Sequence, residues 1–424
     1  MAWNFCDMGG RSQRVLRALA ALVMAGAIAC GDAAPEPTAS YRAPAGPGVC
    51  ALDDDASALP RGAPGVEVFA NIQAIGSAAN AIVHGAGYLW IVESTSNTVS
   101  RFNPETGHYD AYFIDVGDGR NPYALALDAE RQRAYITNWL TNSLSVADLK
   151  SGEILAEVGG ALAATDTAIF DAPQGLTLTP EFIYIANTAY RGPGDYAPGS
   201  VTVLRRDSLE FVAKIESAHR NTAFVQAVST ASGPGVVVVN SGALEVTNAG
   251  AFVRGVSSIE VWREGEDPAQ PARQIYALER SDNPRMGAPG RPVLSASGKT
   301  IYFPSATAPA VFKFDLAAGQ WLRGTVDPIL LHKKNAPTAD GTFNATLDSR
   351  GILYLSALNE DAIYLLDTAC DEVLVAAIPV GTTDSQLEGP QDLEIIESAG
   401  KTSVYFVTTL SNAMGKIALD FAPR

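Results

Sequence analysis

Seven residues with hydrogen-bonding side chains stand at similar places in seven successive segments of the chain. They comprise four amides, one phenol, one guanidinium and one carboxylate. Such a set can hydrogen-bond a small polar ligand, and its oxygen atoms could hold a metal ion. If the positions line a water-filled channel, the same polarity is expected without any ligand. The candidate ligand-binding residues are Asn80, Tyr123, Gln174, Gln226, Arg291, Asn344 and Asp392.

Two histidines offer a second candidate for metal or acid–base chemistry. His219 and His332 are both expected in loops on the same side of the molecule as those seven residues. Basic neighbours follow each of them, at Arg220 and at residues 333–334, and these would oppose a bound cation. Solvated imidazoles in loops are therefore the simpler interpretation.

Acidic residues near the same loops offer a third candidate. Carboxylate oxygens are the ligands that Ca²⁺ prefers, so calcium is the ion we would expect if a metal binds here. An acidic surface loop is the alternative, and we predict no required cofactor. The residues concerned are Asp166, Asp384, Glu388 and Asp392.

Two short segments resemble the end of a phosphate-binding loop. They are Gly298-Lys299-Thr300 and Gly400-Lys401-Thr402. The glycine required five residues upstream is Val293 in one and Ile395 in the other, and no helix is expected after either segment. Both are better interpreted as β-turns. The sequence contains no nucleophile elbow, zinc-ligand spacing or dinucleotide fingerprint, so we assign no catalytic residue.

A repeat of about fifty residues must position these side chains. Its clearest copy has an apolar strand over residues 134–138 and a second strand over residues 143–148. Most units also have an inner strand before these two and a fourth strand after them. Four strands in each of seven units predict an all-β, seven-bladed β-propeller. The last unit lacks a fourth strand, and an extra strand over residues 66–76 is expected to complete it and close the ring.

The repeat resembles the YVTN family of β-propeller repeats. That family has a Tyr-Val-Thr-Asn strand, a Ser/Asn-rich turn, a Val-x-Val-Ile-Asp strand and a last strand ending in Val-Gly. Two units match it closely: Tyr135-Ile136-Thr137-Asn138 with Leu144-Ser145-Val146-Ala147-Asp148 and Val158-Gly159, and Tyr184-Ile185-Ala186-Asn187 with Val201-Thr202-Val203-Leu204. The resemblance covers most of residues 66–421. It implies the fold but no single activity, because related propellers range from lactonases and lyases to binding modules.

The resemblance also implies a metal site. Lactonase-like propellers hold a divalent cation in the tunnel with Glu, Asn and Asp. Counterparts by residue type in this chain are Glu93, Asn344 and Asp392.

Strand order divides the connections between two faces of the predicted ring. Links between second and third strands, and between blades, share one face with the tunnel mouth, and we call it the long-loop face. Insertions collected on one face usually mark a binding surface, whereas neutral drift would not choose one side. The insertions on this face are residues 160–171, 188–199, 241–255, 279–287, 327–337 and 382–389.

The first 29 residues have the pattern of a signal peptide. Three arginines over residues 11–17 precede an apolar stretch over residues 18–29, which is too short to span a bilayer. The stretch ends in Ala27-Ile28-Ala29-Cys30, which resembles the lipobox of bacterial lipoproteins although Ala27 replaces the usual Leu. We therefore predict lipidation at Cys30. An ordinary cleavage site beside a chance cysteine is the alternative.

The remaining sequence before the repeats reads as a tether. Residues 30–65 are rich in Ala, Pro, Gly and acids, and the propeller is expected to occupy residues 66–424. Cys50 and Cys370 are an even pair in an oxidising compartment, so we predict a disulfide on the face opposite the long-loop face. Two unrelated buried thiols are the alternative. The expected location is the bacterial cell envelope, either periplasmic or surface-facing.

The charge of the chain limits its partners. A formal net charge of −16 opposes binding to nucleic acid or to anionic headgroups, so a lipid would be the only membrane anchor. We predict a monomeric binding or scaffold module that takes a protein or a small polar ligand at its long-loop face. The alternative is a metal-dependent lactonase-like or lyase-like enzyme working at the tunnel mouth.

Overall fold

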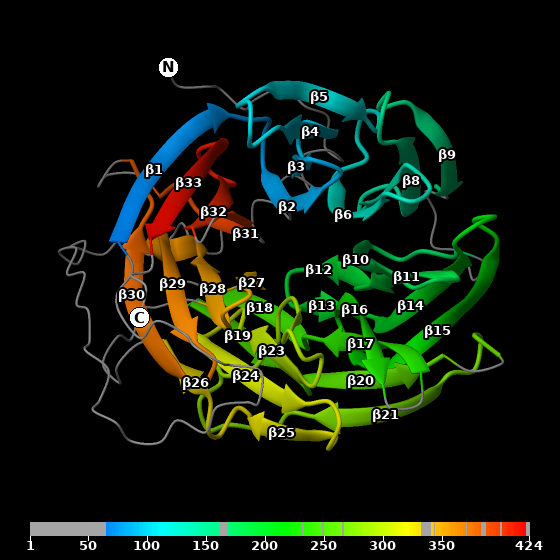
Figure 1. Ribbon diagram of the computed structural model, residues 1–424. Coiled ribbons are helices and arrows are strands. Elements are labelled where there is room, and N and C mark those ends of the chain that lie inside the picture. Colours follow the sequence, from blue (N-terminus) through cyan, green and yellow to red (C-terminus); the bar gives the residue numbers. More distant parts are fainter. Residues whose placement is uncertain are drawn as a thin grey trace.

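The described strands form a ring of radiating sheets. The computed structural model describes residues 65–160, 168–230, 233–247, 250–264, 267–331, 341–342, 344–369, 371–382, 387–398 and 401–420. These residues build six four-stranded antiparallel sheets and one five-stranded sheet around a central tunnel, a seven-bladed β-propeller (Figure 1). The predicted fold class is confirmed. Among these residues no helix is long and apolar enough to cross a bilayer.

Each of the first six blades runs outward in chain order, from an innermost first strand to an outermost fourth strand. Blades one to three contain β2 (Ala79–Gly85), β3 (Tyr88–Glu93), β4 (Thr98–Phe102) and β5 (Tyr109–Asp115); β6 (Pro122–Asp128), β7 (Arg133–Asn138), β8 (Ser143–Asp148) and β9 (Ile154–Gly159); and β10 (Pro173–Leu178), β11 (Phe182–Asn187), β14 (Pro198–Arg205) and β15 (Phe211–Arg220).

The next three blades follow the same order. They contain β16 (Thr222–Thr230), β17 (Gly233–Asn240), β20 (Ser258–Arg263) and β21 (Ala272–Ala277); β22 (Val293–Leu294), β23 (Thr300–Pro304), β24 (Ala310–Asp315) and β25 (Gln320–Arg323), with β26 (Ile329–Leu330) beside β24; and β27 (Ala345–Leu347), β28 (Ile352–Ala357), β29 (Ala362–Asp367) and β30 (Glu372–Pro379). A 3-10 turn, η1 (Leu358–Glu360), joins β28 to β29.

Blade seven closes the ring with strands from both ends of the described chain. Its first three strands are β31 (Pro390–Ser398), β32 (Lys401–Thr408) and β33 (Ala413–Asp420). The fourth is β1 (Gly65–Ala74), which pairs antiparallel with β33 from Gly65 opposite Asp420 to Ala74 opposite Ala413. The predicted closure is confirmed, and the edge that β33 would otherwise expose is paired.

The hydrophobic core lies between the blades. Second and third strands are buried on both faces, and every residue of β11, β28 and β29 is buried. Strands covered on both faces read as continuous apolar runs, which is why these segments lack strict alternation. Outer strands such as β9 alternate or are exposed. Apolar packing between the blade faces therefore stabilises the fold, and polar residues can line the tunnel.

Asparagines in the turns between second and third strands join one blade to the next. Asn97 and Asn142 have left-handed φ angles of 60° and 51°, which Asn tolerates better than most residues. Their Oδ1 atoms accept hydrogen bonds from the backbone N–H groups of Asn121 (2.9 Å) and Ala172 (2.7 Å) at the start of the following blade. Asn412 does the same between blades seven and one. The Ser/Asn-rich turn of the repeat is thus structural.

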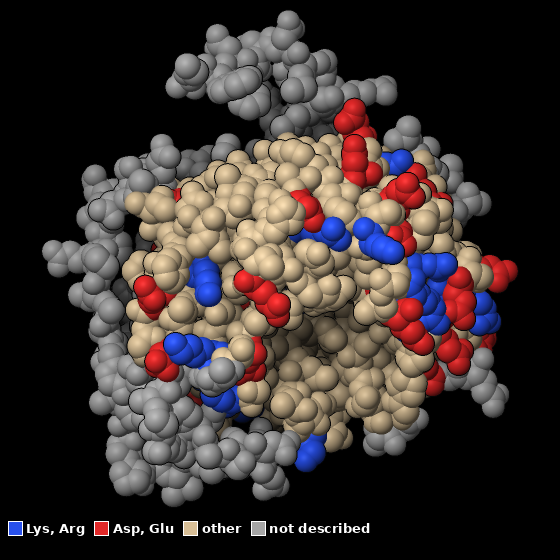
Figure 2. All heavy atoms as spheres, turned by 45° about the horizontal axis from the view of Figure 1, so that its top comes forward, with Lys and Arg blue, Asp and Glu red and all other residues tan. Residues whose placement is uncertain are grey.

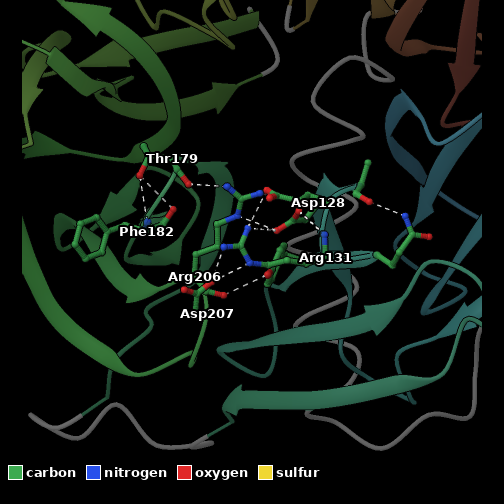
Figure 3. Close-up of polar contacts among 10 residues, drawn as sticks. Asp128, Arg131, Thr179, Phe182, Arg206 and Asp207 are labelled. Atoms are coloured by element: carbon green, nitrogen blue, oxygen red, sulfur yellow. Dashed lines mark hydrogen bonds and ion pairs between the residues drawn. The ribbon is translucent and has the colours of Figure 1, made fainter.

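A buried ion pair joins blades two and three on the face opposite the long-loop face (Figure 3). Asp128, at the end of β6, is fully buried and accepts a hydrogen bond from Arg206 Nε at 2.8 Å. Arg206 also donates to the carbonyl of Thr179 (3.0 Å). Arg131 lies 3.5 Å from the same carboxylate and bonds to Asp207. These contacts fix the spacing of the two blades.

Candidate functional site

Two inserted hairpins project from the long-loop face in the described part of the chain. One is β12 (Tyr190–Gly192) with β13 (Asp195–Tyr196) in blade three, and the other is β18 (Ala243–Thr247) with β19 (Gly250–Arg254) in blade four. Both lie towards the centre of the ring (Figure 1). They touch, since a Cβ at Gly194 would lie 3.6 Å from Cβ of Glu245. Two of the predicted insertions therefore form one continuous surface.

A cleft of about 950 Å³ opens beside the second hairpin. It lies between residues 245–257 and the connection between blades four and five, residues 278–287. Its walls carry apolar side chains such as Phe252 and Met286 together with charges of both signs, including Arg254, which pairs with Glu245. The long-loop face is therefore hollowed beside the ring as well as at its centre.

An ion pair spans the tunnel mouth. Arg291, just before β22 in blade five, donates two hydrogen bonds of 2.9 Å to the two carboxylate oxygens of Asp392 in β31 of blade seven. Blade six separates these blades in the ring, so the pair links two blades that are not neighbours. Asp392 is fully buried and also accepts from the backbone N–H of Ile82 (3.0 Å). Burial raises its pKa, although Arg291 opposes that shift.

A second carboxylate lies two residues further along β31. Glu394 is half-buried, and burial followed by repulsion from Asp392 raises its pKa to about 7. It accepts a hydrogen bond from the backbone N–H of Ile395 (3.4 Å). The sequence analysis did not single out Glu394. Its alternation with Asp392 on an inner strand is the signal that could have identified it.

Tyr123 and Gln174 occupy matching places at the starts of β6 and β10. Gln174 is 7% exposed, and its carboxamide has no hydrogen-bond partner among the described residues. The hydroxyl of half-buried Tyr123 likewise has no partner within that part of the chain. Burial raises the pKa of Tyr123 to about 12, while Arg291 and Asp392 influence it in opposite directions. The phenol therefore lies close to the ion pair and stays neutral.

Three further aromatic residues form a wall behind Tyr123. Rings of Trp139 and Tyr190 have centroids 5.4 Å apart, and those of Tyr190 and Tyr196 are 5.3 Å apart. Trp139 is 7% and Tyr196 4% exposed. Tyr196 lies near enough to Tyr123 for Tyr123 to raise the pKa of Tyr196. The sequence analysis missed this cluster, and aromatic residues inside an insertion were the available signal.

The strand pairing shows that the predicted rim residues do not share one level. Asn80 is the extra residue of a bulge between Ala79 and Ala81. In blade seven the corresponding extra residue is Gln391, and Asp392 is the residue after it. Asp392 and Asn80, which the sequence analysis placed at equivalent positions, are therefore offset by one residue. This offset explains why Asp392 is fully buried while Asn80 is half-buried.

The other three amides of the predicted set each donate a hydrogen bond within the protein. Asn80 Nδ2 donates to Ser94 Oγ at 2.5 Å, and Asn344 Nδ2 donates to the carbonyl of Gln391 at 2.8 Å. Gln226 Nε2 donates to the neighbouring carbonyl of Ala227 at 3.2 Å. These amides hold the wall of the tunnel in shape, and each keeps an oxygen that no described hydrogen bond uses.

The residues that the family resemblance implied for a metal do not fit one. Glu93 is fully buried at the end of β3, where its carboxylate accepts hydrogen bonds from the backbone of Gly76 (2.7 Å) and from Thr98 (2.7 Å). Asp392 is occupied by Arg291. The described residues contain no group of three or more His, Cys, Asp or Glu able to hold a metal ion.

Several other candidates have structural partners or lie outside the described residues. Glu388 accepts a hydrogen bond from the backbone of Thr382 (2.6 Å). The prediction that His219 lies in a loop is wrong, because it lies within β15, where its Nδ1 is 2.8 Å from Ser258 Oγ. Gly298 has φ 71° in a tight turn, so that phosphate-loop lookalike is a turn, as predicted. The candidates that fall outside the described residues are Cys30, Cys50, Asp166, His332, Cys370 and Asp384.

Solved structures share the fold at low sequence identity. Kuenenia stuttgartiensis hydrazine synthase matches with a TM-score of 0.61 and 15% identity, over 82% of this chain and 96% of that one. A structure of U3-55K matches with a TM-score of 0.57 and 11% identity, over 83% and 98%. No protein-family profile and no curated protein sequence matches the chain. Similarity at this level concerns the fold alone.

Proposed function

We propose that the protein is a binding or scaffold module that takes its partner or ligand at the long-loop face. The observation that carries the proposal is the combination of features on this one face. It bears the two touching hairpins, the 950 Å³ cleft and the tunnel mouth, where the side chains of Tyr123 and Gln174 have no hydrogen-bond partner among the described residues. Concave surfaces with a few convergent polar groups are the usual setting for ligand binding.

The setting proposed for this module is the bacterial cell envelope. The leader over residues 1–29 and the lipobox-like segment ending at Cys30 support export and lipid anchoring. The YVTN resemblance of the repeat supports a β-propeller scaffold, a fold that serves binding modules and enzymes alike. The net charge of −16 supports a partner other than nucleic acid, with the lipid as the contact to the membrane.

The alternative is a lactonase-like or lyase-like enzyme at the tunnel mouth. Glu394 favours it, because a carboxyl with a pKa of about 7 can serve as a general base at neutral pH. Arg291 opposes the metal-dependent version, since its guanidinium already neutralises Asp392. Calcium bound by acidic residues of the long-loop face belongs to this alternative.

Photo-crosslinking tests the binding face. A photoreactive residue replaces Arg191, on the β12–β13 hairpin, in one variant and Ser151, on the opposite face, in its control. The full chain is expressed in its native host. We expect a discrete adduct at position 191 and none at position 151. Equal labelling of both faces, or labelling at position 151 alone, would contradict the proposal.

Elemental analysis separates the binding module from the metal-dependent enzyme. The purified chain is assayed for bound metal together with its Asp392→Ala and Asn344→Ala variants. A binding module without metal gives the same low content in all three proteins. A stoichiometric cation that both variants lose would favour the enzyme.

A further inference from the structure

Three side chains at the tunnel mouth are partly or largely buried, and their polar ends make no hydrogen bond within the described residues. Gln174 is 7% and Tyr196 4% exposed, and Tyr123 is half-buried. None of their polar atoms has a hydrogen-bond partner in the described chain. None is among the polar atoms sealed away from solvent without a partner. Each polar end therefore reaches the solvent at the mouth, where a ligand could bond to it.

The three side chains belong to neighbouring elements. β6 and β10 are adjacent inner strands, and Thr137 of blade two donates to the carbonyl of Gln174 at 2.7 Å. Tyr123 and Gln174 thus lie side by side on the tunnel wall. Tyr196 extends from the β12–β13 hairpin above them, close enough for Tyr123 to raise the pKa of Tyr196. The three polar ends converge on one part of the mouth.

The three groups in this part of the mouth are electrically neutral, and nearby Glu394 is largely protonated below its raised pKa of about 7. The charged pair at the mouth, Arg291 and Asp392, is bidentate and already compensated. Figure 2 shows a hollow at the centre of the ring whose visible wall consists mainly of uncharged residues. An anion or a metal ion would need an unpaired opposite charge to repay its desolvation. The available groups, a carboxamide and two phenols, favour a ligand without charge.

An aromatic wall adjoins these neutral groups. Tyr196 packs on Tyr190, which packs on Trp139, and aromatic surface of this kind holds the apolar side of an amphipathic ligand. A carboxamide can donate and accept at once, as can a phenol, which suits hydroxyl groups that also do both. A purely apolar ligand would leave the carboxamide of Gln174 desolvated without a hydrogen bond, which costs free energy. Hydroxyl groups on a ring with an apolar face satisfy both requirements.

We propose that the tunnel mouth binds the terminal residue of a neutral saccharide, with Gln174 and Tyr123 bonding its hydroxyl groups and Tyr196 contacting its ring. The proposal rests on the proposed binding function and names the ligand class for that face. The Arg291–Asp392 pair forms the far side of the site and rejects charged sugars, because neither of its charges is free.

Binding of short neutral saccharides to the purified full chain tests the proposal. Cellotriose, maltotriose, xylotriose and chitotriose are each added at about 5 mM, and contact is detected by saturation-transfer NMR and quantified by calorimetry. We expect at least one to bind. Gln174→Leu and Tyr123→Phe should each weaken that binding about tenfold, the loss expected for one hydrogen bond. Gln320→Leu, a matched change at an exposed residue on the opposite face, should leave it unchanged.

Further controls make the result decisive. The thermal midpoint of each variant is measured, and Tyr123→Phe preserves the ring, so loss of binding with an unchanged midpoint reports on the hydroxyl alone. The proposal is overturned if none of the four sugars binds, if both variants bind normally, or if glucuronate or choline binds through the same residues. Crosslinking at position 191 without sugar binding would reject this ligand class and leave the binding function standing.

Discussion

Removal of Arg206 should destabilise the propeller by leaving a buried charge without its main partner. Asp128 is fully buried and Arg206 is 14% exposed, so the pair lies in a region of low dielectric constant. Burial raises the pKa of Asp128, but the hydrogen bonds and charges of Arg206 and Arg131 together outweigh burial and hold the pKa below its usual value, with Arg206 contributing most. The folded carboxylate is therefore stabilised by this partner. The change considered is Arg206→Ala.

The loss in free energy of unfolding expected for Arg206→Ala depends on the contacts that Asp128 keeps. Breaking a buried ion pair from one side costs about 3–5 kcal/mol. Arg131 remains 3.5 Å from the carboxylate and its backbone still donates to Asp128 at 3.0 Å, which favours the lower end. We expect about 3 kcal/mol. With about 2 cal/mol/K of unfolding entropy per residue, a propeller of roughly 350 residues should lose about 4 °C in thermal midpoint.

Urea unfolding followed by tryptophan fluorescence measures the loss, with Arg323→Ala as matched control. Arg323 is 37% exposed and pairs with partly and largely exposed carboxylates, so its removal should cost less than about 1 kcal/mol. The double variant Asp128→Leu with Arg206→Met should recover most of the stability, because it removes both charges and keeps the volume.

The pH dependence of the loss provides a second readout. Because the folded pKa of Asp128 is depressed, its contribution is complete above about pH 4 and is lost as the pH falls through the folded pKa. The difference in free energy of unfolding between wild type and Arg206→Ala should therefore become smaller at acidic pH. The reasoning is refuted if Arg206→Ala costs no more than Arg323→Ala at neutral pH, or if the difference grows below pH 4.

Three further outcomes follow from other sites. The raised pKa of Glu394, about 7, means that the folded chain holds an extra proton between about pH 4.3 and 7, so the free energy of unfolding should fall as the pH rises through that window; Glu394→Gln should flatten this slope in urea titrations. Cys30→Ser should abolish labelling by an alkyne fatty acid and release the protein from membranes, and persistent labelling would reject lipidation. Non-reducing peptide mapping should recover a Cys50–Cys370 linked peptide, and two free thiols would exclude it.

The fold could be predicted because each repeat is too small to bury its apolar faces alone and must pack against its neighbours. Apolar runs ending in Asn138 and Asn187 indicated strands packed on both faces, and the structure shows these residues buried at blade ends. The unpaired strand before the first unit predicted ring closure, and β1 beside β33 confirms it. Local pattern determines these features, so one sequence is enough.

The detailed site could be predicted only in part. Residue types placed Asp392 and Arg291 at the mouth, but no local signal indicated that they would bond across blade six. The bulges in the inner strands add one residue without changing composition, and they moved Asp392 off the level of Asn80. Glu93 has the residue type of a metal ligand, yet its burial beside Gly76 makes it structural. Long-range contacts of this kind need coordinates.

The pairing of β1 with β33 also governs how the molecule must assemble. These strands are about 350 residues apart in sequence, and the ring cannot close until the second has left the ribosome. Until then blade seven has an open edge and a missing neighbour, so the half-made chain is exposed to wrong strand pairing. If the chain is exported unfolded, as we propose, the ring closes only after the chain has crossed the membrane.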